Sequence, residues 1–148
     1  MKLSTRGRYG VRAMLDLATH YGEGTVLLKD IAKRQEISER YLENIIRVLV
    51  ANDLVNSTRG RSGGFSLAKP PGEIRLRQII EAVEGSIASV FCVDNPKLCR
   101  RTPICVTREV WERLKKAMQD VLDSMTLRDL VEMEKEKLTE PEAQMYYI

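Results

Sequence analysis

The period of the apolar residues changes near residue 54, and this change constrains the fold more than any other feature. Before it, apolar side chains recur at helical spacing in three segments, about 9–20, 28–35 and 38–52. After it, two short runs typical of β-strands, 54–58 and 65–68, flank the Gly-rich basic segment 59–64. Helical spacing returns at about 76–84, 106–125 and 127–137. We therefore expect a mainly α-helical fold with one small β-hairpin.

A tight turn joins the second and third predicted helices, and Ser38 is a favourable N-cap for the third. Two short helices joined in this way, followed by a hairpin with a basic tip, are typical of a winged helix-turn-helix domain. We predict such a domain over residues 1–84, with the helix-turn-helix at about 28–51 and the wing at about 54–68.

The C-terminal part of the sequence divides into three segments. We expect a cysteine-bearing sensor loop over 85–105, a long helix with a short terminal helix over 106–137, and a polar tail over 138–148. One face of the long helix carries an apolar stripe made of Val110, Leu114, Ala117, Met118, Val121, Leu122 and Met125. An isolated helix of this length needs a partner for such a face. We therefore predict a dimerisation helix; the alternative is that the helix folds back onto its own domain.

Charge is unevenly distributed along the chain. Its 148 residues include 24 Lys and Arg and 21 Asp and Glu, which gives a formal net charge of +3. Residues 1–70 hold 12 basic and 7 acidic side chains, whereas residues 71–148 hold 12 basic and 14 acidic ones. A basic excess confined to the predicted winged helix indicates a polyanionic partner such as nucleic acid.

The third predicted helix carries side chains suited to a DNA major groove. Arg40, Asn44 and Arg47 can donate to bases or phosphates, and Glu43 can accept from a cytosine amino group. Ser38 stands at the helix N-terminus, where free backbone N–H groups favour a phosphate. A helix face of this composition is also common on surfaces that only contact water.

The predicted wing tip is equally suited to the DNA backbone. Arg59 and Arg61 can neutralise phosphates or enter the minor groove, and the glycines at 60, 63 and 64 permit a close approach. Alone, such a tip also fits an ordinary turn. Its place directly after a helix-turn-helix, in the basic half of the chain, favours double-stranded DNA as the partner.

Several segments resemble the IscR-like (Rrf-type) family of bacterial winged-helix regulators. The resemblance rests on the opening segment 1–18, on Ile37 to Glu43, on Gly63 to Leu67 and on the three-cysteine loop, and it covers about residues 1–135. It implies a homodimer whose long C-terminal helix crosses to the partner subunit and which binds palindromic operators. It also implies major-groove contacts by Ser38, Arg40, Glu43 and Asn44, and a minor-groove wing formed by Arg59, Gly60 and Gly64. The chain departs from the family at Arg61-Ser62, which replaces a Pro-Gly pair of the iron–sulfur regulator.

The three cysteines, Cys92, Cys99 and Cys105, lie within a window of 14 residues. Thiolates clustered on a polar loop are suited to an iron–sulfur cluster or to zinc, although the spacing lacks the CxxC pairs of a zinc ribbon. Neighbouring arginines would favour the thiolate form. The family resemblance implies that the three cysteines are ligands of a [2Fe–2S] cluster.

The fourth ligand of such a cluster is missing from its expected place. The cluster-bearing family members have a histidine three residues after the last cysteine, and this chain has Arg108 there. The chain's histidine, His20, stands at the end of the first predicted helix and is typical of a capping or surface residue. A cluster would therefore need Asp94 or Glu109, a residue from the other subunit, or an exogenous thiol.

The sequence supports two hypotheses for the function. The first is a dimeric, sequence-specific DNA-binding transcription regulator whose operator binding is controlled by a [2Fe–2S] cluster that senses iron–sulfur status, redox state or nitric oxide. The alternative is a clusterless regulator of cysteine or sulfur metabolism that acts through thiol chemistry or a partner enzyme.

Enzymes and membrane proteins fit the sequence poorly. No nucleophile–base pair or Walker phosphate loop is recognisable, and the Gly-rich segment 60–64 does not open a helix. No apolar run approaches the roughly 18 residues of a membrane span, and the N-terminus lacks a secretory signal pattern. Three cysteines without an export signal also argue against a disulfide framework. We expect a cytoplasmic protein that is not an enzyme and has no membrane partner.

Overall fold

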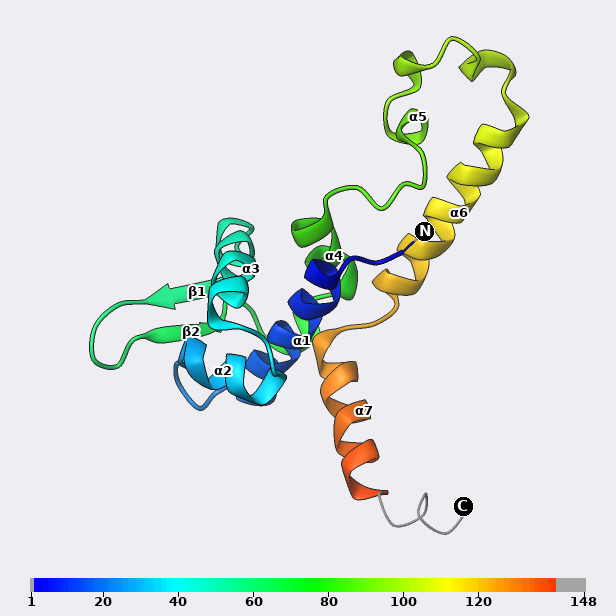
Figure 1. The fold of residues 1–148 in the computed structure, drawn as a ribbon. Coiled ribbons are helices and arrows are strands. Elements are labelled where there is room, and N and C mark those ends of the chain that lie inside the picture. Colours follow the sequence, from blue (N-terminus) through cyan, green and yellow to red (C-terminus); the bar gives the residue numbers. More distant parts are fainter. Residues whose placement is uncertain (1, 141–148) are drawn as a thin grey trace.

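The computed structural model describes residues 2–140 of the chain. Its helices are α1 (Thr5–Thr19), α2 (Leu28–Gln35), α3 (Glu39–Ala51), α4 (Leu76–Glu84), α5 (Phe91–Asp94), α6 (Val106–Asp123) and α7 (Leu127–Thr139). An antiparallel hairpin of β1 (Val55–Thr58) and β2 (Gly64–Leu67) follows α3 (Figure 1). The predicted mainly helical fold with a two-stranded wing is confirmed. Most of the predicted tail, residues 141–148, lies outside the described residues.

The turn between α2 and α3 is closed by the residues that stand there in the sequence. Glu36 ends α2 in the left-handed region with φ 54°. Ser38 caps α3, since its hydroxyl oxygen accepts a hydrogen bond from the Tyr41 backbone N–H at 3.3 Å. Ile37 and Leu42 are both buried on either side of this cap, as a hydrophobic staple requires. The helix-turn-helix is therefore held by local chemistry.

Helix α1 lies at the centre of the N-terminal core and packs against α2, α3, α4 and α7. The largest side chains with almost no exposure come from all these elements and their connections: Met14, Leu17, Ile31, Leu42, Ile45, Ile46, Leu49, Val55, Ile74, Ile79 and Leu127. Burying such side chains stabilises the fold by roughly 1.5–3 kcal/mol each before entropy is counted. The domain that carries α3 and the wing thus has a core of its own.

Helix α1 begins earlier than the apolar pattern indicates, at Thr5 with Ser4 as its N-cap. The early glycines belong to the helix because they let it approach α4 closely. A Cβ on Gly10 would lie 3.2 Å from a methyl carbon of Val83, and Gly7 faces the carboxylate of Glu84. Tertiary packing therefore overrides the low helix propensity of glycine here.

The wing is anchored to the loop between α1 and α2. Its strands pair from Val55 with Leu67 to Thr58 with Gly64. Near the tip-side end of the ladder, Val26 and Phe65 exchange two backbone hydrogen bonds of 2.8 Å, so that Val26 acts as a third, very short strand beside β2. The wing therefore leaves the domain in a defined direction.

The two long C-terminal helices run in different directions (Figure 1). Helix α6 extends away from the core, and within residues 2–140 none of its side chains is fully buried. Helix α7 turns back onto α1, starts at Thr126 with a capping box, and buries Leu127 completely. The segment 92–105, expected to be an irregular loop, contains part of α5 and two 3-10 turns. No helix in the described part of the chain combines the length and the apolar run that a membrane crossing needs.

Candidate DNA interface and cysteine loop

Helix α3 presents its polar residues on one exposed face. Its opposite face is fixed in the core by Leu42, Ile45, Ile46 and Leu49. The predicted DNA-contacting residues Ser38, Arg40, Glu43 and Asn44 are all exposed, and so is Arg47. The face that sequence reasoning assigned to DNA is therefore accessible, and its orientation is set by the burial of the other face.

Two of these side chains contact each other along the helix. The Arg47 guanidinium donates to the Glu43 carboxylate at 2.6 Å, one helical turn away. Both groups are exposed, so this ion pair adds little to stability. Its consequence is local: Arg47 partly neutralises the negative charge of Glu43, which would otherwise repel a phosphate.

The wing brings further basic residues to the same end of the molecule as α3 (Figure 1). Arg59, Gly60 and Arg61 form its exposed tip, and Gly60 has a left-handed φ of 101° with no atom near the position of a Cβ. Gly64 differs, because a Cβ there would lie 2.6 Å from the Val26 carbonyl oxygen. Gly64 therefore belongs to the anchor of the wing, whereas Arg59, Gly60 and Arg61 face outward.

A buried ionic network that the sequence reasoning missed sets α2 against α1. Asp16 is 3% exposed and accepts hydrogen bonds from Arg34 and Gln35 of α2. Gln35 in turn accepts from the Arg12 side chain. The signal in the sequence was an aspartate among the apolar positions of a helix, which calls for a partner.

His20 occupies the C-cap of α1, as its position in the sequence indicated. Its Nδ1 lies 2.8 Å from the Asp16 backbone oxygen and 3.7 Å from the Asp16 carboxylate. It is therefore part of the α1–α2 network and far along the chain from the cysteine loop.

The three cysteines lie on the segment that connects α4 to α6. Cys92 belongs to α5, Cys99 follows a 3-10 turn, and Cys105 is the N-cap of α6. All three are half-buried, and in the described part of the chain they form no disulfide. Figure 1 places this segment at the far end of α6 from the winged domain.

Two side-chain contacts tie the cysteine segment to α6. The Arg108 Nε–H donates to the Cys92 backbone oxygen at 3.1 Å while the same guanidinium pairs with Glu112 at 2.6 Å. Lys115 pairs with Asp94 at 2.6 Å, and this contact, with a hydrogen bond from Ser86, lowers the pKa of Asp94. The segment is thus fastened to the first ten residues of the long helix.

The Cys105 thiol lies in surroundings that favour its thiolate. The Thr107 hydroxyl, 3.3 Å from Sγ, contributes most to lowering the pKa of Cys105, and the Arg108 backbone N–H and the Arg101 charge add to it. A thiolate is the form that attacks oxidants or binds soft metals.

The donor atoms fit an iron–sulfur cluster better than their arrangement does. Three thiols are suitable ligands in kind. Within residues 2–140, however, no three His, Cys, Asp or Glu side chains converge as a metal site. Arg108 has no lone pair to offer, and Asp94 is engaged by Lys115. One protomer in this arrangement therefore supplies no fourth ligand at the expected place; Glu109 remains exposed on α6.

The chain is similar to known proteins along most of its length. The model of the Rrf2 family, described as iron-dependent transcriptional regulator, matches residues 3–133. Protein rrf2 of Nitratidesulfovibrio vulgaris is 44% identical over 131 residues, which are 88% of this chain and 87% of that protein. The regulator CymR of Bacillus subtilis is 40% identical over 148 residues, 100% of both chains.

The solved structures that resemble this chain include both IscR and CymR. The structure of T. potens IscR superimposes with a TM-score of 0.76 at 45% identity and covers 99% of this chain and 97% of that one. The structure of CymR, described as the global cysteine regulator of B. subtilis, gives a TM-score of 0.75 at 39% identity and covers 90% and 98%. Similarity of nearly equal size to IscR and CymR leaves the chemistry of the cysteine loop to be decided by this chain's own residues.

Proposed function

The chain belongs to the Rrf2 family of transcriptional regulators, and we propose that it is a dimeric, sequence-specific regulator whose operator affinity is set by the state of its cysteine loop. As a member of this family it is a DNA-binding transcription regulator and not an enzyme. The main support for DNA binding through this domain is the exposed polar face of α3 beside the basic wing tip. We propose that it acts in the cytoplasm, where bacterial DNA lies.

We assign α3 to the major groove. Arg40 and Asn44 donate to base edges or phosphates, and Glu43 accepts from a cytosine amino group when Arg47 turns to a phosphate. The Ser38 hydroxyl already accepts from Tyr41, so its own hydrogen is left to donate to a phosphate oxygen. These assignments separate residues that select bases from residues that position the domain.

We assign the wing tip to the sugar–phosphate backbone and the minor groove. Arg59 and Arg61 are exposed, and the tip segment 59–64 contains no acidic residue that would compete for them, so both are suited to bind phosphates. The freedom of Gly60 to hold φ 101° brings the backbone close to the DNA. Arg61-Ser62, in place of the Pro-Gly pair of the iron–sulfur regulator, adds a positive charge there, so we expect stronger phosphate binding.

We assign α6 to a homodimer interface. Val106, Val110 and Val121 of the amphipathic helix α6 are more than half exposed, although their side chains are apolar. A hollow of about 610 Å³ beside the second half of α6 is lined by Ala117, Met118 and Leu122 together with the end of α4 and residues 86–89. The α6 helix of a second copy would cover these surfaces, and a two-fold dimer would place two α3 helices roughly 34 Å apart for a palindromic operator.

For the cysteine loop, our first candidate is a [2Fe–2S] site held by Cys92, Cys99 and Cys105. A bound cluster would supply an oxidant-sensitive link among three points of the loop. The fourth ligand would come from Glu109, from the other subunit or from an exogenous thiol. The chain itself holds the loop on α6 through Arg108 and Lys115. A change in the loop would therefore alter the contacts at the start of the dimer helix.

The second candidate is a clusterless thiol or partner-enzyme sensor, and one observation favours it. Arg108 stands where the family histidine is expected, and Glu112 and the Cys92 backbone hold it there. A cation fixed beside the loop favours thiolates without completing a ligand set.

One preparation separates the two candidates. Protein purified without oxygen is examined for visible absorption at about 400–500 nm, the region of thiolate-ligated clusters, and its iron and acid-labile sulfide are counted. About two irons and two sulfides per chain would support the cluster. Colourless, iron-free protein that still binds a palindromic operator would favour thiol or partner sensing. If the protein binds no operator either with or without a cluster, the whole proposal is contradicted.

A further inference from the structure

The winged domain and the α6–α7 corner are joined by a short backbone ladder. The Leu76 N–H donates to the Met125 oxygen at 3.0 Å, and the Leu127 N–H donates to the Ile74 oxygen at 3.0 Å. Arg75 and Thr126 form the bridge between these bonds. Ile74 and Leu127 are fully buried. The corner at which α6 ends is therefore rigidly attached to the segment that leads from the wing into α4.

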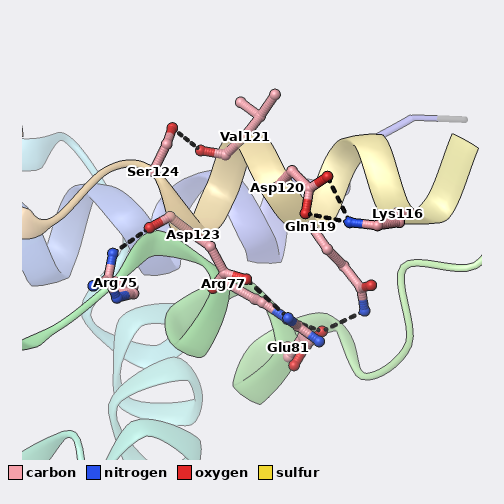
Figure 2. A network of polar contacts seen from close by, with 9 residues as sticks. All are labelled: Arg75, Arg77, Glu81, Lys116, Gln119, Asp120, Val121, Asp123 and Ser124. Atoms are coloured by element: carbon pink, nitrogen blue, oxygen red, sulfur yellow. Dashed lines mark hydrogen bonds and ion pairs between the residues drawn. The ribbon is translucent and has the colours of Figure 1, made fainter.

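Five polar residues form a network of contacts across this corner, between α4 and the C-terminal end of α6. Figure 2 shows the Arg77 side chain between α4 and α6, with its Nη1 2.9 Å from an Asp123 carboxylate oxygen and its Nε 2.9 Å from Glu81. Gln119 of α6 donates to the same Glu81 oxygen at 3.4 Å, and Arg75 donates to the Asp123 backbone oxygen. We call Arg75, Arg77, Glu81, Gln119 and Asp123 the Arg77 clamp.

The clamp acts on a helix that has few other ties to the winged domain. Leu122 near the C-terminal end of α6 and Met125 just after it pack against the core, whereas Arg108 and Lys115 of α6 contact the cysteine segment. Helix α6 has 18 residues. It is therefore about 27 Å long, and a tilt of about 10° at the corner would move its far end by about 5 Å.

A displacement of this size is larger than the rise of one base pair, about 3.4 Å. In a dimer built through α6, the angle between α6 and the winged domain fixes the separation of the two α3 helices, and operators are recognised by the spacing of their half-sites. Both Arg77 and its partners are partly exposed, so the clamp is accessible to substitution without opening the core.

We propose that the Arg77 clamp is a positioning device that sets the angle between the winged domain and α6, and thereby the operator half-site spacing that the dimer accepts. This inference rests on the proposed function, because it requires a dimer through α6 on a two-part operator. The opposing explanation is that the clamp only caps the C-terminal end of α6 and adds stability.

The test uses operator length. A duplex is first selected by the full-length wild-type protein from random double-stranded DNA and is then rebuilt with its centre shortened or lengthened by one and two base pairs. Affinities for this series are measured for the wild type, for Arg77→Met and for Asp123→Asn. Lys116→Met is the matched control: it also removes one positive charge, and the Lys116–Asp120 pair at 2.9 Å lies within α6 alone (Figure 2).

We expect Arg77→Met and Asp123→Asn to lower the preference for the selected spacing by about fivefold, or to move the optimum, as suits a network of partly exposed ion pairs. Lys116→Met should keep the wild-type profile, and all variants should bind a single half-site equally. An unchanged spacing profile in both clamp variants would overturn the inference, even if their affinity or melting temperature fell for every duplex. Loss of the dimer in the clamp variants would overturn it as well. Failure of the wild type to select any two-part site would instead refute the proposed function on which it rests.

Discussion

Arg34 holds both carboxylate oxygens of Asp16, with its Nε 2.9 Å from one oxygen and its Nη2 2.8 Å from the other. The Asp16 side chain is 2% exposed, whereas that of Arg34 is 40% exposed. The first lies in α1 and the second in α2. The position of the helix-turn-helix on the core thus depends on a charge pair of which one member cannot reach water.

We predict that Arg34→Met destabilises the protein by about 3 kcal/mol, because it leaves a buried carboxylate without its partner. Arg47→Met, which removes the exposed partner of Glu43, should cost less than about 1 kcal/mol. Urea unfolding of the two variants measures both free energies. Equal losses of unfolding free energy in the two variants would show that the buried Asp16–Arg34 pair stabilises the protein no more than the exposed Glu43–Arg47 pair.

The same pair predicts a pH dependence. Burial acts to raise the pKa of Asp16, but hydrogen bonds from Arg34 and Gln35 and the charges of Arg34 and His20 outweigh it and hold the pKa below its usual value. The stabilisation is therefore complete above the unfolded-state pKa of about 3.9 and is lost as the pH falls through the lower folded-state pKa. Below pH 4 the unfolding free energy of the wild type should fall more steeply than that of Asp16→Asn. Parallel curves would contradict this assignment.

Removing a phosphate contact should change the salt dependence of DNA binding. For Arg59→Ala we expect weaker binding to all sequences and a slope of log affinity against log salt that is shallower by about 0.9. Lys135→Ala, on the exposed face of α7, is the control and should keep the wild-type slope. If both variants keep it, the wing does not contact phosphate.

Glu43 should act mainly on base selection. Its substitution by Ala removes the carboxylate that pairs with Arg47 at 2.6 Å, so binding to random DNA should become tighter while discrimination at one base pair falls by about 1–3 kcal/mol. Glu39→Ala removes the same charge from the first turn of α3 and serves as the control. Competition binding with operators that carry single base changes measures the difference. Equal profiles for both variants would remove Glu43 from the base-contacting set.

The sequence predicted most of the winged domain because its signals there are local. Helices 28–35 and 76–84 have the bounds that their apolar spacing and flanking turns indicate. The earlier start of α1 could not be predicted, because Gly7 and Gly10 are favoured only by the close approach of α4. Helix α5 has only four residues, which is too short for an apolar periodicity to predict it. Contacts with Arg108 and Lys115 of α6 hold it instead.

The sequence predicted some parts of the candidate sites and not others. The exposed face of α3 follows from the burial of its other face, and periodicity reveals both. The Asp16 network and the Arg77 clamp join residues that are 18 and 46 positions apart, so only the folded chain brings them together. The clustering of the cysteines along the chain was visible, whereas the contacts of Arg108 that occupy the expected ligand position were not.

The central claim is that a [2Fe–2S] cluster on the cysteine loop controls DNA binding, and one comparison tests it most directly. Operator affinity is measured at fixed salt for protein loaded anaerobically with iron and sulfide and for the same sample stripped by a chelator, in the wild type and in Cys92→Ala. We predict a change in operator affinity of at least about tenfold, near 1.4 kcal/mol, between the loaded and stripped wild type, and no change in Cys92→Ala. Equal wild-type affinities in the loaded and stripped states, or a full response that persists in Cys92→Ala, would contradict it.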